Sequence, residues 1–353
     1  MSSLELRNII KRYRNVTALK DVSFQVNNEE FFVLLGPTGA GKTTTLRVVA
    51  ALTKQDAGSV LFDGQAVDDL TPADRDVGFV FQQYSLYPTM TVYDNLAFPL
   101  RSPMRKVPED QIKTRIAQVA EILRITHLLE RKTARLSGGE MQRVSIGRAI
   151  VRQPRIFLMD EPLSNLDAKL RESLRIELKH MQKEQGNTTL FVTHDQIEAL
   201  TMADRIGVLH QGRLIQVGAP DEIYDQPATT YVAGLVGTPH INLVEASRED
   251  GTLFVANSDM RIPLSADQSL PSTLQVGVRP EDIKPDPHGD FTGEVTLVEP
   301  LGVETILHIR SGEQTLLSLI AGMTPLKLHD NVRFSILRDR LHFFDMEGQR
   351  IPT

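Results

Sequence analysis

The sequence predicts an α/β domain with an inserted helical subdomain, followed by a smaller all-β domain. In residues 1–236, short apolar runs of strand length alternate with amphipathic helical stretches, a pattern typical of a sheet covered on both faces by helices. Residues 87–150 interrupt this alternation with a mostly helical stretch. In residues 237–353, short alternating segments are separated by Gly, Pro, Asp and Asn, which favours a barrel-like β domain.

Three apolar runs are predicted to be buried parallel strands. They span residues 31–35, 155–160 and 189–193, and none of them alternates between apolar and polar positions. Parallel strands carry function at their carboxyl ends, so the residues that follow these runs are the first candidates for a site.

Two amphipathic helices are predicted, over residues 108–125 in the insert and over residues 168–185. In each, apolar residues recur at three- and four-residue intervals, which indicates one face packed on a core. The apolar positions are Ile112, Ile116, Val119, Ile122 and Leu123 in the first helix, and Leu170, Leu174, Leu178 and Met181 in the second.

Composition narrows the class of protein. The 353 residues are 41% apolar and 24% charged, which is ordinary for a globular chain of two or three domains. The formal net charge of −6 argues against binding nucleic acid mainly through its phosphates. The chain has no cysteine, which excludes disulfides and thiolate metal sites and favours a reducing compartment, although a simple secreted enzyme would also fit. No apolar run approaches the roughly 20 residues of a membrane span, and the N-terminus lacks a secretory apolar core.

The segment from Gly36 to Thr43 matches the pattern G-x-x-x-x-G-K-[ST], between an apolar strand and a helical stretch. Its glycines let backbone N–H groups surround a polyphosphate, Lys42 supplies a point charge, and the Thr43 hydroxyl can ligate Mg²⁺. A chance match has odds of roughly one in a hundred in a chain of this length, so a plain glycine turn is the weaker interpretation. The predicted nucleotide-binding residues here are Gly36, Pro37, Thr38, Gly39, Ala40, Gly41, Lys42, Thr43 and Thr44.

Two carboxylates, Asp160 and Glu161, end the predicted strand over 155–160. In that position Asp160 would hold Mg²⁺ directly or through water, and Glu161 would polarise the attacking water. An isolated Asp-Glu pair could equally be a solvated strand end before the Pro162 turn. Beside a phosphate loop, the catalytic interpretation is favoured.

The segment from Leu136 to Glu140 reads L-S-G-G-E, is followed by M-Q-R-V-S-I-G-R-A, and closely resembles the signature motif of ABC-family ATPases. Ser137 can cap a helix, while Gly138 and Gly139 leave bare N–H groups, so the segment can form a second anion site. The resemblance implies a head-to-tail dimer in which each ATP lies between the Gly36 loop of one subunit and the Ser137 helix of the other. Alone, the segment would be an ordinary Ser-capped helix.

Position 140 departs from the family pattern, because Glu140 stands where many relatives carry glutamine. The change places a negative charge beside an anion site. We expect Glu140 to be tolerated, because the remaining ATP machinery is complete.

Four further residues stand in the order of this family. By resemblance, Tyr13 would stack on adenine, Gln82 would contact Mg²⁺ and water, Asp167 would lie in the loop that crosses the dimer interface, and His194 would contact the γ-phosphate. An isolated tyrosine more often packs, and an isolated histidine after a strand is usually a surface residue. The resemblance implies that Glu161, His194 and Gln82 are catalytic, and that Thr43, Gln82 and Asp160 hold Mg²⁺.

Segments outside the ATP motifs resemble maltose-type sugar importers. Residues 83–100, from Gln83 to Leu100, resemble the segment that docks on the permease, and residues 229–242 resemble the domain junction. Residues 277–283 resemble a motif of the accessory domain, which is built from paired OB-like barrels. The resemblance implies a peripheral subunit at the cytoplasmic face of the inner membrane. It would pair with itself or a paralogue beneath two permeases fed by an external binding protein, and no nucleic acid partner is expected.

Three other functions compete with sugar uptake. The nearest is an importer of ferric ion, polyamine or sulfate, whose ATPases share the accessory domain; the 238–242 junction favours carbohydrates. A soluble ABC ATPase acting on ribosomes or DNA typically has two cassettes or long coiled coils, whereas this chain has one Gly36 loop and no heptad run. A degenerate regulatory subunit is disfavoured because Lys42, Asp160, Glu161 and His194 are all present.

Overall fold

The computed structural model describes residues 2–103, 107–264 and 270–352. The chain divides into two compact units, Met1–Pro220 and Asp221–Thr353, and each is described by itself.

The first unit is built on a six-stranded sheet of order β10-β9-β3-β8-β7-β6. The five strands from β9 to β6 are parallel, and β10 is antiparallel at the edge. The three predicted strands are confirmed as β3, β7 and β8. Their carboxyl ends meet at one edge of the sheet, which is where ligands bind in such folds. The bounds are β3 (Phe31–Leu35), β6 (Val77–Val80), β7 (Ile156–Asp160), β8 (Thr188–Thr193), β9 (Arg205–His210) and β10 (Arg213–Gly218).

A second, antiparallel sheet of order β2-β1-β4-β5 packs on this core. Its inward side chains and those of the parallel sheet form one cluster, in which the rings of Phe24 and Phe32 stack with centroids 5.0 Å apart. The strands are β1 (Leu4–Tyr13), β2 (Val16–Val26), β4 (Ala57–Phe62) and β5 (Gln65–Ala66).

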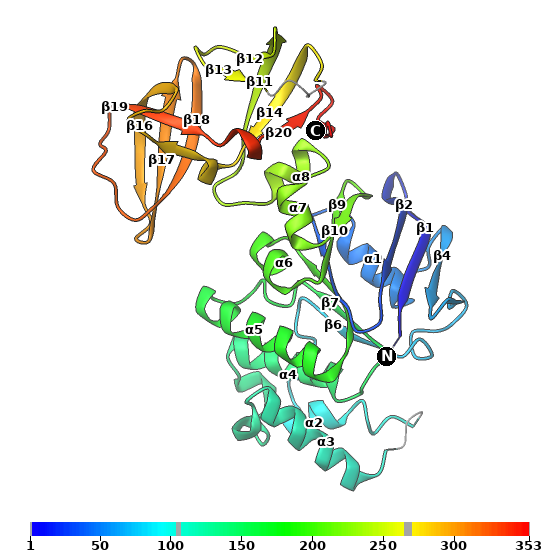
Figure 1. Cartoon of the computed structure of the whole chain (residues 1–353). Helices are drawn as coiled ribbons and strands as arrows, with labels where there is room; N and C mark the ends of the chain where they lie inside the picture. The colour runs from blue at the N-terminus through cyan, green and yellow to red at the C-terminus, as the bar shows by residue number, and fades with distance from the viewer. Residues whose placement is uncertain (1, 104–106, 265–269, 353) are drawn as a thin grey trace. The chain divides into compact units, whose positions relative to one another are not determined.

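Three helices of the first unit lie together. Figure 1 shows α2, α3 and α4 gathered on one side, apart from β1 and β2. These three lie within residues 87–150, where a helical insert is expected. The helices are α1 (Lys42–Val49), α2 (Val92–Ala97), α3 (Glu109–Ile122), α4 (Gly138–Ile150), α5 (Ala168–Gln185) and α6 (Gln196–Met202), with 3₁₀ turns at Thr126–Leu128 and Thr133–Arg135.

The apolar stripe of α3 is narrower than predicted. Ile112, Ile116, Val119 and Leu123 are buried, but Ile122 is 41% exposed. The buried positions follow one another at intervals of four, three and four residues, so Ile122 falls beside the stripe rather than on it. Its assignment to the core face was wrong.

The second unit is mostly β, as predicted, and its described residues also include two short helices. It has two antiparallel five-stranded sheets of order β13-β12-β11-β14-β20 and β15-β19-β16-β17-β18, whose inner faces share one apolar core. The strands are β11 (Asn242–Glu249), β12 (Thr252–Val255), β13 (Arg261–Pro263), β14 (Thr273–Val278), β15 (Ile283–Pro285), β16 (Phe291–Pro300), β17 (Glu304–Ser311), β18 (Gln314–Ala321), β19 (Asn331–Ile336) and β20 (His342–Phe344); short 3₁₀ turns lie at Pro280–Asp282 and Arg338–Arg340.

The buried guanidinium of Arg279 holds the helices α7 (Pro220–Asp225) and α8 (Thr230–Leu235) to this β core. Its Nη1 donates to the carbonyls of Ala233 (3.1 Å) and Val236 (2.6 Å), and Nη2 donates to the carbonyl of Tyr224 (2.7 Å). The guanidinium also lies 3.9 Å from the centroid of the Tyr224 ring. Residues 221–236 therefore group with the second unit, whereas the boundary expected from sequence lies after them, at 236/237.

His342 makes the stability of the second unit dependent on pH. Burial, together with the nearby charges of Arg279, Arg350 and Arg340, lowers its pKa from 6.5 to about 4. The unfolded chain therefore takes up a proton before the folded chain does as the pH falls. The stability contributed by neutral His342 is present above pH 6.5 and is lost towards pH 4, by on the order of 3 kcal/mol.

Urea unfolding of the full chain at several pH values checks this expectation. In a His342→Gln variant, the fall in unfolding free energy between pH 6.5 and pH 4 should become shallower than in the parent chain. An unchanged pH slope in the variant would exclude His342 as the titrating group.

Candidate active site

The predicted phosphate-binding loop, residues 36–41, connects β3 to α1, and two glycines determine its shape. A Cβ on Gly36 would lie 2.2 Å from the carbonyl oxygen of Leu209, so no larger residue fits there. Gly41 has φ +112° and caps the N-terminus of α1, in the region of backbone space that favours glycine. The loop therefore brings bare backbone close to the helix start, as anion binding requires.

Lys42 turns back over this loop and is only 4% exposed. Its Nζ donates to the carbonyls of Gly36 (2.8 Å) and Pro37 (3.0 Å) and lies 3.3 Å from Oε1 of Glu161. A buried ammonium group that is held this way supplies a fixed positive charge at the mouth of the loop.

Thr43 and Asp160 meet at the end of β7. The Thr43 hydroxyl donates to Oδ1 of Asp160 at 2.9 Å, and burial raises the pKa of that carboxyl. In the part of the chain that the structure describes, no three His, Cys, Asp or Glu side chains form a metal cluster. The oxygens of Thr43, Asp160 and Gln82 are nevertheless the hard donors that Mg²⁺ prefers, and such a site usually shares the ion with substrate phosphates. Thr43, Asp160 and Gln82 therefore fit a Mg²⁺ ion.

Glu161 and His194 lie together because their strands, β7 and β8, are parallel neighbours. Oε2 of Glu161 is 2.9 Å from Nδ1 of His194, while the other carboxylate oxygen faces Lys42. Glu161 adopts φ 45°, a left-handed conformation that is uncommon outside glycine and recurs at functional sites. The carboxylate is thus held between a cation and an imidazole.

Lys42, Thr43 and Glu161 border a cavity of about 460 Å³, whereas Asp160 and His194 are not among its lining residues. Eight predicted residues line it: Thr38, Gly39, Gly41, Lys42, Thr43, Thr44, Gln82 and Glu161. The remaining lining residues were not predicted; they are Val16, Thr17, Ala18, Lys20, Gln211 and Gly212. Two features of the sequence could have indicated these residues. One is the cation of Lys20, in the run that follows Tyr13, and the other is the Gln211-Gly212 turn between two apolar runs.

Two residues expected at the nucleotide have other contacts here. Tyr13 ends β1, is 42% exposed, and has Nζ of Lys11 5.3 Å from its ring centroid; it does not line the cavity. Asp167 caps α5 by accepting a hydrogen bond from the N–H of Leu170 (3.1 Å). Their contacts with nucleotide stay predictions.

The signature segment forms a capping box at the start of α4. The Ser137 hydroxyl accepts from the N–H of Glu140 (3.4 Å), and Oε2 of Glu140 accepts from the N–H of Ser137 (2.7 Å) and from its hydroxyl (2.9 Å). The hydrogen bond from the backbone of Ser137 lowers the pKa of Glu140. A Cβ on Gly139 would lie 2.0 Å from the Leu170 side chain, so this glycine also permits packing on α5.

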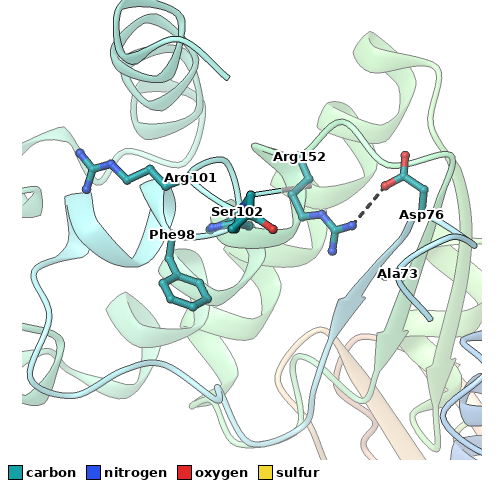
Figure 2. A pocket seen from close by; sticks show the side chains of 8 residues that line it. Ala73, Asp76, Phe98, Arg101, Ser102 and Arg152 are labelled. Atoms are coloured by element: carbon teal, nitrogen blue, oxygen red, sulfur yellow. Dashed lines mark hydrogen bonds and ion pairs between the residues drawn. The ribbon is translucent and has the colours of Figure 1, made fainter. Parts of the chain in front are cut away.

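A second cavity, of about 700 Å³, lies beside α2 and the end of α4. Figure 2 shows Phe98, Arg101 and Ser102 on one side and the ion pair between Arg152 and Asp76 (3.2 Å) on another. Phe98 is 48% exposed, which is high for an aromatic side chain. Phe98 lies within the segment that resembles a permease-docking segment. The cavity is lined by Ala73, Asp76, Phe98, Pro99, Arg101, Ser102, Pro103 and Arg152.

Among the described residues, no helix combines the length and apolarity needed to cross a membrane.

The chain is similar to known proteins over almost its whole length. Residues 19–164 match the family model described as ABC transporter, and residues 276–344 match the TOBE domain. The chain is 45% identical to the trehalose/maltose import ATP-binding protein MalK of Thermococcus litoralis, over 98% of both proteins. It is 44% identical to the sn-glycerol-3-phosphate import ATP-binding protein UgpC of Vibrio vulnificus, over 99% of this chain and 95% of that protein.

Solved structures extend the comparison. The ATP-binding cassette MJ0796, in a dimeric post-hydrolysis state bound to ADP and Pi, matches with a TM-score of 0.56 and 32% identity. The match covers 62% of this chain and 98% of that one. With its ATPase motifs, its TOBE domain and near-full-length relatives, the chain belongs to the ABC transporter family, among the import ATP-binding proteins.

Proposed function

We propose that the chain is the ATP-hydrolysing motor subunit of an importer for a sugar, a sugar derivative or a polyol. The observation that carries the proposal is the meeting of Lys42, Glu161 and His194 at one edge of the sheet, beside the Thr43–Asp160 pair. The substrate class rests on relatives named for trehalose/maltose and sn-glycerol-3-phosphate import, which match this chain over almost its whole length.

In the proposed reaction, the loop N–H groups and Lys42 bind the phosphates of ATP, and Thr43, Asp160 and Gln82 hold Mg²⁺. When bound, Mg²⁺ neutralises charge that develops on the phosphate oxygens. Glu161 accepts the proton of the attacking water, as a carboxylate within hydrogen-bond reach of that water can. His194 holds Glu161 in place through its Nδ1 contact.

Two copies of the ATPase, identical or paralogous, would complete each other's sites. The residues proposed to reach the nucleotide of the partner copy are Ser137, Gly138, Gly139 and Glu140 of the signature helix, with Asp167 at the interface. The dimeric cassette structure with a similar fold supports this arrangement. ATP drives closure only to the extent that it binds the closed dimer more tightly than the open one.

Residues 83–100 are proposed to contact two membrane permeases, with the 700 Å³ cavity as the receiving groove. Half-exposed Phe98 gives it an apolar side, and Arg101 and Arg152 add donors for polar groups. The subunit would then lie peripherally at the cytoplasmic face of the inner membrane, and an extracytoplasmic binding protein would deliver substrate to the permeases.

Reconstitution of the assembled importer tests this function. The chain would be co-expressed with a candidate permease pair and reconstituted in proteoliposomes with a candidate binding protein. Uptake of labelled maltose, trehalose and glycerol 3-phosphate would be measured with ATP inside or outside. We expect uptake that requires ATP on the side of this chain. Recovery of the chain with ribosomes or DNA, and none with permeases, would overturn the proposal.

Glu140→Gln is expected to change turnover by less than tenfold, a barrier change below ~1.4 kcal/mol. The carboxylate of Glu140 faces Ser137, where glutamine can accept the same backbone hydrogen bond. Steady-state ATP hydrolysis by the assembled importer checks this, with Glu121→Gln, an exposed site on α3, as the matched control. A rise above tenfold would show that the Glu140 charge inhibits closure.

A further inference from the structure

Arg148 of α4 contacts the loop that follows Gln82. Its Nη1 donates to the carbonyl of Ser85 at 2.7 Å, and its Nη2 lies 3.5 Å from the carbonyl oxygen of Tyr84. The guanidinium carbon also lies 5.8 Å from the centroid of the Tyr87 ring. A planar guanidinium with contacts in several directions restrains both the position and the orientation of the backbone it holds.

This loop, between β6 and α2, depends on side chains for its shape because it contains no helix or strand among its described residues. At its far end, the backbone of Tyr87 is anchored by Asn95, whose Oδ1 accepts from the Tyr87 N–H (2.9 Å), and by the Thr133 hydroxyl (2.8 Å). Ser85 adopts φ 52°, which is unfavourable for serine unless neighbours hold it. Arg148 provides such a restraint in the middle of the loop.

Both ends of this connection lead to the ATP site. Gln82 lines the nucleotide cavity and precedes the carbonyls that Arg148 holds by two and three residues. Ser137 caps the first turn of α4, and Arg148 lies in the last turn of the same helix. Because a helix of this length moves as a rigid element, a displacement of Ser137 towards the nucleotide of a second subunit carries Arg148 and the loop with it.

We propose that Arg148 is a positioning residue for ATP hydrolysis, which couples the placement of the signature helix to the placement of Gln82. Arg148 acts through the loop and contacts none of the residues proposed to bind the phosphates. The inference rests on the proposed function, because it requires Gln82 to act at the hydrolysis site.

A double-mutant cycle in the assembled importer tests the coupling. Arg148→Met is expected to lower kcat about tenfold and to change the KM for ATP less than twofold, because the Lys42 loop is untouched. In a Gln82→Ala background, the same substitution should lower kcat less than twofold. A residue with a merely structural role would give independent effects, which multiply.

Arg143→Met is the matched control. Arg143 lies on the same helix and is partly buried, but it bonds Glu177 and the carbonyl of Leu123 instead of the loop. Its effect on kcat should be the same with and without Gln82→Ala. Arg148→Lys retains the charge without the planar fork and should give an intermediate kcat. If Arg148→Met does not fold, as judged by circular dichroism, Arg148→Lys replaces it in the cycle.

One result would overturn the coupling through Gln82 alone, and another would overturn the proposed function as well. Equal kcat losses from the Arg148 substitution in both backgrounds would exclude coupling through Gln82 and leave the proposed function intact. An unmodified assembly that transports without hydrolysing ATP would overturn the proposed function, and the positioning role with it.

Discussion

Glu161→Gln is expected to reduce ATP hydrolysis at least a hundredfold while ATP binding persists, because a positioned general base typically contributes about 10²–10⁴-fold. Glutamine keeps the size of the side chain but cannot accept the proton of the attacking water. It also removes the ion pair at 3.3 Å between Glu161 and Lys42, which leaves the ammonium group available to phosphate. ATP affinity should therefore be equal to or higher than that of the parent chain, and closed dimers should accumulate.

Phosphate release and gel filtration with ATP and Mg²⁺ measure these two effects separately. Glu172→Gln, an exposed glutamate outside the cavity, is the matched control and should retain hydrolysis. Turnover of Glu161→Gln within a few-fold of the parent would remove Glu161 from the role of base. His194, its 2.9 Å neighbour, would then be the next candidate.

Lys42→Ala should weaken ATP binding by about 10- to 100-fold, which corresponds to the roughly 1.5–3 kcal/mol of a charged hydrogen bond. Lys42 is almost fully buried, so its charge is poorly screened by water. The substitution also leaves Glu161 without its cation and leaves the carbonyls of Gly36 and Pro37 without their donor. The loss should therefore appear in the dissociation constant, whereas Glu161→Gln acts on kcat.

Isothermal titration with ATP measures the affinity, and thermal unfolding checks that the variant is folded. Lys54→Ala, which removes an exposed lysine outside the cavity, should bind ATP like the parent chain. An unchanged dissociation constant for Lys42→Ala would contradict the assignment of Lys42 to the phosphates.

Much of the fold followed from local patterns. The strands β3, β7 and β8 were predicted within one residue, because unbroken apolar runs of strand length suit a sheet buried on both faces. The long helix α5 was predicted with the bounds that the structure shows, because its apolar residues recur at helical spacing. The limit of such patterns shows at Ile122, which is apolar and near the stripe of α3 but exposed.

Contacts between distant segments were beyond the sequence. Nothing near Glu161 indicates that its carboxylate lies between Lys42 and His194, because that arrangement depends on the order of β3, β8 and β7 in the sheet. The cavity residues that include Lys20 and Gly212 lie on β2 and in the turn between β9 and β10, and neither segment carries a nucleotide motif.

At Glu140, the sequence and the structure each revealed a different part of the account. Its departure from the family pattern was visible in the sequence, but only the structure places its carboxylate on Ser137. The sequence by itself determined which chemical groups this protein carries and which strands and helices present them, because both depend on neighbouring residues. The tertiary structure decided which of those groups meet, including Arg148 with Ser85 and Arg279 with α8, because such contacts depend on packing between residues far apart in the chain.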